Sequence, residues 1–139
     1  MRRFLLAAAI ICCSGCASLQ SQDQLYRDLG GQRGVENIVD GLLDNIATDD
    51  RIFDQFREAD IDHLRSKLIE QICAISGGPC TYSGDSMEKS HDGKHITEAH
   101  FNALVEDLIL AMEKQRVPVA AQNRLLAELA PMRPQIINR

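Results

Sequence analysis

Residues 77–101 read GGPCTYSGDSMEKSHDGKHITEAHF, and this stretch separates two helical parts of the chain. Its first twenty residues, 77–96, contain glycines, a proline and serines and show little helical periodicity. A structureless loop of that length in a small domain usually has a function or binds a ligand. Three of the four histidines, His91, His95 and His100, lie at its end. The stretch is therefore where we look for a functional site.

Apolar residues on both sides of this stretch recur at steps of three and four, which is the spacing of one helix face. No segment shows the sustained alternation of a strand, so the sequence predicts an all-α fold. The four apolar stripes are Val35, Ile38, Val39, Leu42, Leu43 and Ile46; Ile61, Leu64, Leu68, Ile72 and Ile75; Phe101, Leu104, Val105, Leu108, Ile109 and Met112; and Leu125, Leu126 and Leu129.

The ends of these helices are predicted from residues that favour caps or break helices. Asp60 or Asp62 is the expected N-cap of the second helix, and Thr97 is the expected N-cap of the third. Pro131 and Pro134 should end or kink the last helix.

The first residues are typical of an export signal rather than of a folded domain. Two arginines precede a short apolar run that is too short to span a bilayer. The end of this run, residues 13–16, resembles a bacterial lipobox, which implies a signal peptide over 1–15 and a lipid anchor on Cys16. Residues 16–22 form a polar tether, and 23–139 form the domain. The expected location is the periplasmic face of the outer membrane; the alternative is cleavage near Ala17 and a soluble periplasmic protein.

The net charge bears on the binding partners of the domain, and the cysteine content bears on whether it contains a disulfide. Removal of the signal with its two arginines takes the formal net charge from −5 to −7, so nucleic acid is not an expected partner. Cys73 and Cys80 are the cysteines that remain in the domain. In an oxidising compartment they could pair, but either could equally be a small core residue.

The spacing of the histidines, taken alone, does not decide whether the chain has a metal site. His91 and His95 could lie one helical turn apart as a zinc pair, although no glutamate completes a known zinc motif. Isolated helical histidines are more often surface or core residues.

Three motifs together are similar to those of group I truncated haemoglobins. Residues 25–31, LYRDLGG, resemble the family's N-terminal motif, in which paired glycines end a very short first helix. Residues 77–84, GGPCTYSG, resemble its second glycine motif, which precedes the short proximal helix. Residues 87–101 match its proximal-histidine segment, and the similarity covers about 23–137. It implies a two-over-two helical sandwich that carries haem b.

The resemblance also assigns roles to single residues. It implies that His91 is the proximal ligand of the haem iron and that Phe56 packs on the haem face. The residues expected to form part of the cavity wall, each of which is also an ordinary core residue type, are Tyr82, Met87, Ile96, Phe101 and Val105.

The side of the haem opposite His91 departs from the family pattern. Leu43 stands where many members carry a tyrosine that hydrogen-bonds the ligand, and Leu64 and Leu68 stand where further polar groups often lie. A neutral hydrogen bond contributes about 0.5–1.5 kcal/mol, so oxygen should leave faster than from tyrosine-bearing relatives. CO and NO should be less affected.

Lys67 lies on or beside the same stripe as Leu64 and Leu68. In some members the residue here coordinates the iron as a sixth ligand, and a desolvated lysine can lose its proton to do so. The alternative is a lysine whose stem covers the haem edge while its ammonium reaches solvent. His63 is a weaker candidate because it points off the stripe.

The resemblance implies reversible binding of O2, CO or NO. Two other functions stay open: a haem-dependent redox enzyme acting on NO or peroxide, and a haem-free interaction lipoprotein. The sequence identifies no redox partner.

Overall fold

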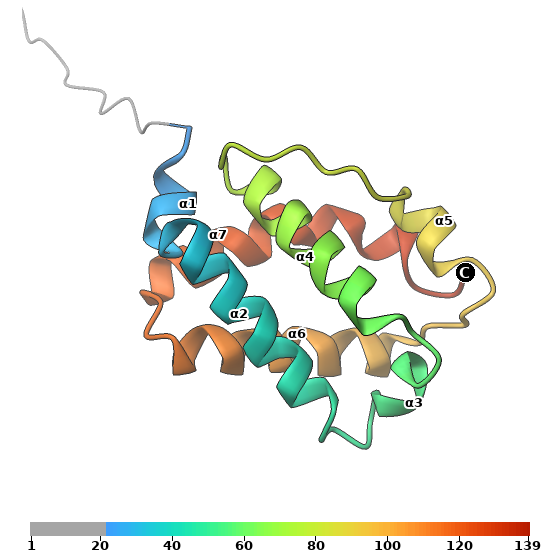
Figure 1. Ribbon diagram of the computed structural model, residues 1–139. Coiled ribbons are helices and arrows are strands. Elements are labelled where there is room, and N and C mark those ends of the chain that lie inside the picture. Colours follow the sequence, from blue (N-terminus) through green and yellow to red (C-terminus); the bar gives the residue numbers. More distant parts are fainter. Residues whose placement is uncertain (1–21) are drawn as a thin grey trace, which may run out of the picture.

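The computed structural model describes residues 22–139, and every regular element in that part of the chain is a helix. Helices α2 and α4 lie side by side across α6 and α7, which forms two layers of two helices (Figure 1). The predicted all-α, two-over-two fold is therefore confirmed. The elements are α1 (Gln24–Asp28), α2 (Gly31–Ile46), α3 (Phe53–Phe56), α4 (Ile61–Ile75), α5 (Met87–His91), α6 (Glu98–Lys114), α7 (Val119–Leu129) and the 3-10 helix η1 (Ala130–Gln135).

The four periodic stripes correspond to α2, α4, α6 and α7, and the caps settle where two of them begin. Asp60, and not Asp62, caps α4, because its side chain accepts a hydrogen bond of 3.0 Å from the backbone N–H of His63. Thr97 caps α6 as predicted and accepts from the backbone N–H of His100 at 3.2 Å. These bonds satisfy N–H groups that the helix cannot pair internally.

Four short helices, α1, α3, α5 and η1, lie outside those stripes. α3 has only four residues and α5 has five, which is too short for an apolar repeat to be read. α5 occupies part of the stretch 77–96, where the resemblance but not the periodicity implied a helix. After α7 the chain tightens into η1, which contains Pro131 and Pro134. The prolines therefore end the α-helix as predicted.

The two paired-glycine motifs bring α1 against the end of α4. Gly30, with φ +95°, and Gly77, with φ +83°, adopt left-handed conformations that side chains disfavour. A Cβ on Gly77 would also lie 1.9 Å from the carbonyl oxygen of Gln22. At the same place the backbone N–H of Tyr26 donates to the carbonyl oxygen of Ser76 at 3.0 Å. Gly77 is needed because two backbones approach closely there, and Gly30 is needed for the left-handed turn between α1 and α2.

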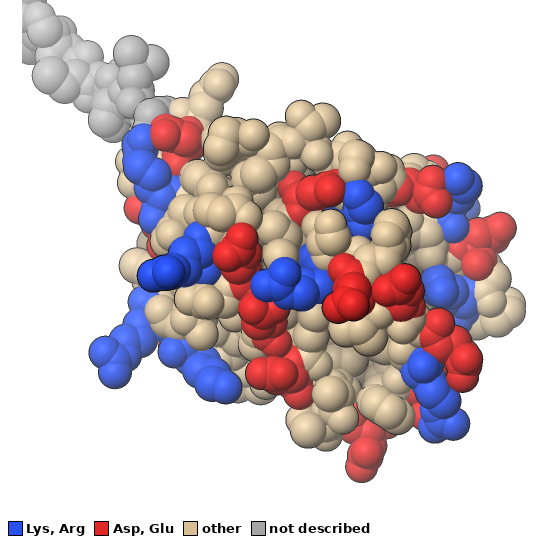
Figure 2. All heavy atoms as spheres, viewed as in Figure 1, with Lys and Arg blue, Asp and Glu red and all other residues tan. Residues whose placement is uncertain are grey.

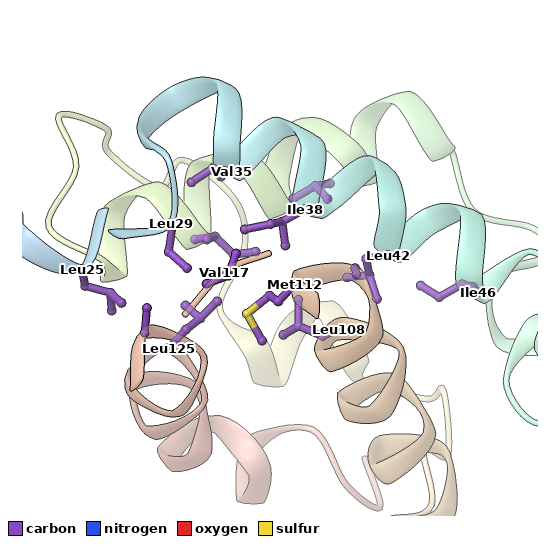
Figure 3. Packing of buried hydrophobic residues seen from close by; sticks show 14 of the residues in the cluster. Leu25, Leu29, Val35, Ile38, Leu42, Ile46, Leu108, Met112, Val117 and Leu125 are labelled. Atoms are coloured by element: carbon purple, nitrogen blue, oxygen red, sulfur yellow. The ribbon is translucent and has the colours of Figure 1, made fainter. Parts of the chain in front are cut away.

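The core lies between the two layers. In Figure 3, Val35, Ile38 and Leu42 of α2 lie opposite Leu108 and Met112 of α6. Full burial of such a side chain contributes about 1.5–3 kcal/mol. The buried apolar cluster consists of Leu25, Leu29, Val35, Ile38, Val39, Leu42, Ile46, Ile52, Ile72, Ala103, Leu108, Ala111, Met112, Val117, Ala121 and Leu125.

Cys73 and Cys80 form a disulfide, which settles the alternative that the sequence left open. Cys73 lies near the end of α4 and is fully buried, and the two Cα atoms are 5.7 Å apart. Closing so short a loop stabilises the fold by about 2.5 kcal/mol in the chain-entropy account. The bond fixes the start of the connection between α4 and α5.

Several predictions concern residues outside the described range. The signal peptide over 1–15, Cys16 and the tether as far as Ser21 lie there. Within residues 22–139, no helix has the length and apolar character that crossing a bilayer requires. On the face seen in Figure 2, acidic and basic side chains are interspersed rather than gathered into a basic patch.

Asp107 on α6 is an ionisable side chain in the core. It is only 4% exposed, and its Oδ2 atom has no hydrogen-bond partner among the described residues. Burial raises the pKa of this carboxyl above its ordinary value, and the negative charge of Asp49 adds to the rise while Arg51 opposes it. The folded protein thus holds this proton more tightly than the unfolded chain.

We expect Asp107→Asn to be more stable than wild type at about pH 7, by about 1 kcal/mol. The raised folded-state pKa contributes stability that is fully present below the unfolded value of about 3.9 and is lost as the pH rises through the folded value. The advantage of the variant should therefore shrink as the pH falls toward 4. Urea denaturation at several pH values measures it. A variant that is less stable than wild type near neutral pH contradicts this account.

Candidate functional site

A cavity of about 390 Å³ opens between α4, α5 and the start of α6, and α3 and the chain end close it. Its wall is mainly apolar, and it lies beside the core rather than inside it. Predicted site residues that line it are His91, Phe56, Tyr82, Met87, Leu64, Leu68, Phe101 and Lys67. The structure therefore brings together side chains from separate helices that the sequence grouped only through resemblance.

Leu43 and Val105 are exceptions, because neither is among the residues that line this cavity. Leu42 lines the cavity instead, whereas Leu43 lines a smaller hollow of about 220 Å³ that shares Ile46 and Phe56 with it. Leu42 and Leu43 are consecutive helical residues that point about 100° apart, and their side chains line different hollows. Counting from the glycine motif gave the position along α2 but not the rotation of the helix.

The His91 ring is held in one orientation at the end of α5. Its Nδ1 atom lies 2.7 Å from the carbonyl oxygen of Met87, one turn earlier in the helix. A carbonyl oxygen can only accept, so Nδ1 carries the proton and Nε2 of the neutral ring keeps its lone pair. This is the arrangement by which proteins orient a metal-binding imidazole. Since His91 lines the cavity, it offers a nitrogen ligand there.

Lys67 lines the cavity, but its ammonium group is engaged beside it. Nζ donates to both carboxylate oxygens of Glu70, at 2.9 and 3.0 Å, and to the hydroxyl of Ser83 at 2.7 Å. Lys67, and then Ser83, lower the pKa of Glu70 to about 2, so this carboxylate stays ionised near neutral pH. The side chain that the resemblance made a candidate sixth ligand is thus held by an acid and a hydroxyl.

His63, His95 and His100 have different surroundings. His95 lies beyond the end of α5 with a left-handed backbone, so the helical His91–His95 zinc pair is wrong. No group of three or more metal-binding side chains occurs among residues 22–139. His63 and His100 both line the cavity. Nδ1 of His100 also accepts from the backbone N–H of Thr97 at 3.3 Å, which completes the cap of α6.

Several residues that sequence reasoning missed also line the cavity, and three of them come from separate parts of the chain. Gln55, Gln71 and Ile136 come from α3, α4 and the chain end. Nε2 of Gln71 donates to the sulfur atoms of Met87 and Met132 at 3.5 and 3.4 Å. No sequence pattern marked these residues, because only the folded chain brings α3 and the C-terminal segment to the cavity.

Comparison with known proteins agrees with this fold. A family profile described as bacterial-like globin matches residues 24–138. The chain therefore belongs to the bacterial-like globin family. Within that family, its curated relatives are group 1 truncated haemoglobins. The one from Nostoc sp. strain MUN 8820 is 32% identical over 115 residues, which is 83% of this chain and 98% of the relative.

Solved structures show the same fold. The truncated haemoglobin of Tetrahymena pyriformis in its Fe(III) form superposes with a TM-score of 0.80 at 24% identity, over 83% of this chain and 98% of that one. The two-over-two haemoglobin of Synechococcus sp. PCC 7002, solved with covalently attached haem, gives a TM-score of 0.76 at 23% identity with the same coverage. Both place this chain among two-over-two globins by fold.

Proposed function

We propose that this chain is a haem b globin that reversibly binds O2, CO or NO, with His91 as the proximal ligand of the iron. The observation that carries the proposal is the hydrogen bond from Nδ1 of His91 to Met87, which leaves Nε2 free in the cavity. The family supports it, because the relatives are named truncated haemoglobins. When bound, haem supplies an iron with one coordination position for a diatomic ligand.

The residues present fit this group. A volume of about 390 Å³ is in the range of small-molecule pockets, and an apolar wall with few polar groups suits a flat, largely apolar cofactor. Phe56 and Phe101 supply aromatic surface, and His91 supplies the nitrogen. In this proposal the helices orient the ring, exclude water from the apolar wall and leave the opposite side open.

The wall on α4 determines how the bound ligand is held. Leu64 and Leu68 line the cavity and cannot donate hydrogen bonds, while His63 of α4 and Gln55 of α3 are polar residues that also line it. The amide of Gln71 is directed to two methionine sulfur atoms. We therefore infer weak polar stabilisation of bound O2 and little discrimination against CO.

The proximal role is tested by absorption spectroscopy of the purified protein after addition of haem. Wild type should show a Soret band, and His91→Gly should lose or shift it because the iron loses its axial nitrogen. Added imidazole should restore the wild-type spectrum. His95→Gly is the matched control, since His95 is exposed and has a left-handed backbone that glycine accepts. A colourless wild type, or a His91→Gly spectrum identical to wild type, sinks the proposal.

Leu68→Gln should slow O2 dissociation by about two- to tenfold, because an added neutral hydrogen bond is worth about 0.5–1.5 kcal/mol. Stopped-flow or flash photolysis of the ferrous protein measures the rate, and CO dissociation should change less. Leu110→Gln, on the exposed side of α6, is the control. Equal rates for Leu68→Gln and wild type would show that residue 68 does not reach the ligand.

We also propose that the protein is exported and anchored by lipid on Cys16. The lipobox resemblance supports this, and the Cys73–Cys80 disulfide suits an oxidising compartment. Cells expressing the full chain should incorporate labelled palmitate into it, and Cys16→Ser should abolish the label while Cys12→Ser does not. An unlabelled, soluble periplasmic protein would favour simple signal cleavage.

A further inference from the structure

The connection between α4 and α5 runs back alongside α4 (Figure 1). It is tied to that helix at two places. The disulfide joins Cys73 to Cys80. The second tie joins Glu70, three residues before Cys73, to Ser83, three residues after Cys80. Residues three apart lie on the same face of a helix, so the two ties follow one face of α4. Lys67, three residues before Glu70, lies on the same face of α4 and lines the cavity.

The second tie is a closed network of three side chains. Glu70 Oε2 accepts from the backbone N–H of Ser83 at 3.0 Å and from its hydroxyl at 2.8 Å. The hydroxyl in turn accepts from Lys67 Nζ at 2.7 Å, and both Glu70 oxygens accept from the same ammonium. Lys67 is thus held from its own helix and from the connection that leads to α5.

This network differs from an ordinary surface ion pair. The side chains of Lys67 and Glu70 are 23% and 28% exposed, whereas those of Arg57 and Asp54, another pair three residues apart, are 61% and 76% exposed. Exposed pairs contribute little because solvent screens them and both side chains stay mobile. Here charge-assisted bonds and a backbone donor fix the geometry, so the lysine position is determined by its partners.

We propose that Glu70, with Ser83, is a positioning residue that holds Lys67 away from the iron and keeps the coordination position opposite His91 open to an external ligand. The inference rests on the proposed haem function. Lys67 and His91 line one cavity from α4 and α5, and an amine nitrogen is a ligand for ferric iron. Without its carboxylate partner, the flexible lysine stem can turn its nitrogen into the cavity, where the ammonium would release one proton to solvent and the neutral amine would donate its lone pair to the iron.

The experiment compares ferric haem-loaded wild type with Glu70→Gln by absorption and electron paramagnetic resonance spectroscopy. Wild type should be high-spin, with an open position, and Glu70→Gln should become mainly low-spin. If Lys67 occupies the open coordination position in about nine-tenths of the molecules, the apparent Kd for azide should rise about tenfold. The double variant Glu70→Gln/Lys67→Ala should return to the wild-type spectrum and azide affinity.

Two further variants separate this role from general damage. Glu113→Gln, the same change at an exposed position near the end of α6, should leave the spin state unchanged. Ser83→Ala removes one acceptor for the lysine and should shift the spin state in the same direction by less, which keeps the test available if Glu70→Gln does not fold.

The outcomes distinguish this inference from the proposed function. Absence of a Soret band in every protein, wild type included, refutes haem binding itself. A Soret band with a low-spin wild type overturns the inference, because Lys67 or another group then occupies the iron despite Glu70. A Soret band with high-spin spectra for wild type, Glu70→Gln and Ser83→Ala alike overturns it as well.

Discussion

The hydrogen bond between Nδ1 of His91 and the carbonyl oxygen of Met87 determines what the cavity can do. It joins residues four apart in a five-residue helix, so the ring orientation depends on α5 staying folded. So short a helix is not stable alone. It is held by the side chain of Ser86, which accepts from the backbone N–H of Lys89 at 3.3 Å, and by contacts with η1. The orientation of the His91 ring therefore depends on packing around α5.

The long helices could be predicted because each carries its own signal. Stripes of apolar residues predicted α2, α4, α6 and α7, and Thr97 predicted where α6 begins. α3 could not be predicted in this way, since one helical turn has no period. The choice between Asp60 and Asp62 depended on which carboxylate reaches a free backbone N–H, and only the structure shows this. Local patterns therefore specified the layers but not the short elements between them.

Most residues that line the cavity could be predicted, whereas their orientations and hydrogen-bond partners could not. Resemblance grouped His91, Phe56 and Lys67, and the structure places all three around one cavity. It could not give the rotation of α2, and Leu42 therefore lines the cavity where Leu43 was expected. The partners of Lys67 were also beyond prediction, because Ser83 reaches the lysine only after the α4–α5 connection folds back. Contacts between distant segments set these details.

The α4–α5 connection links the two sides of the cavity mechanically. One end of it begins at the disulfide on α4, and the other leads into the helix that carries His91. Between them Ser83 is bonded to Glu70, so a shift of this segment changes the partners of Lys67 and the support of α5 together. The covalent tie at Cys80 lies three residues before Ser83 and anchors that part of the connection to α4. A disulfide between residues seven apart in the sequence and the network of Lys67, Glu70 and Ser83 thus hold the same segment against α4.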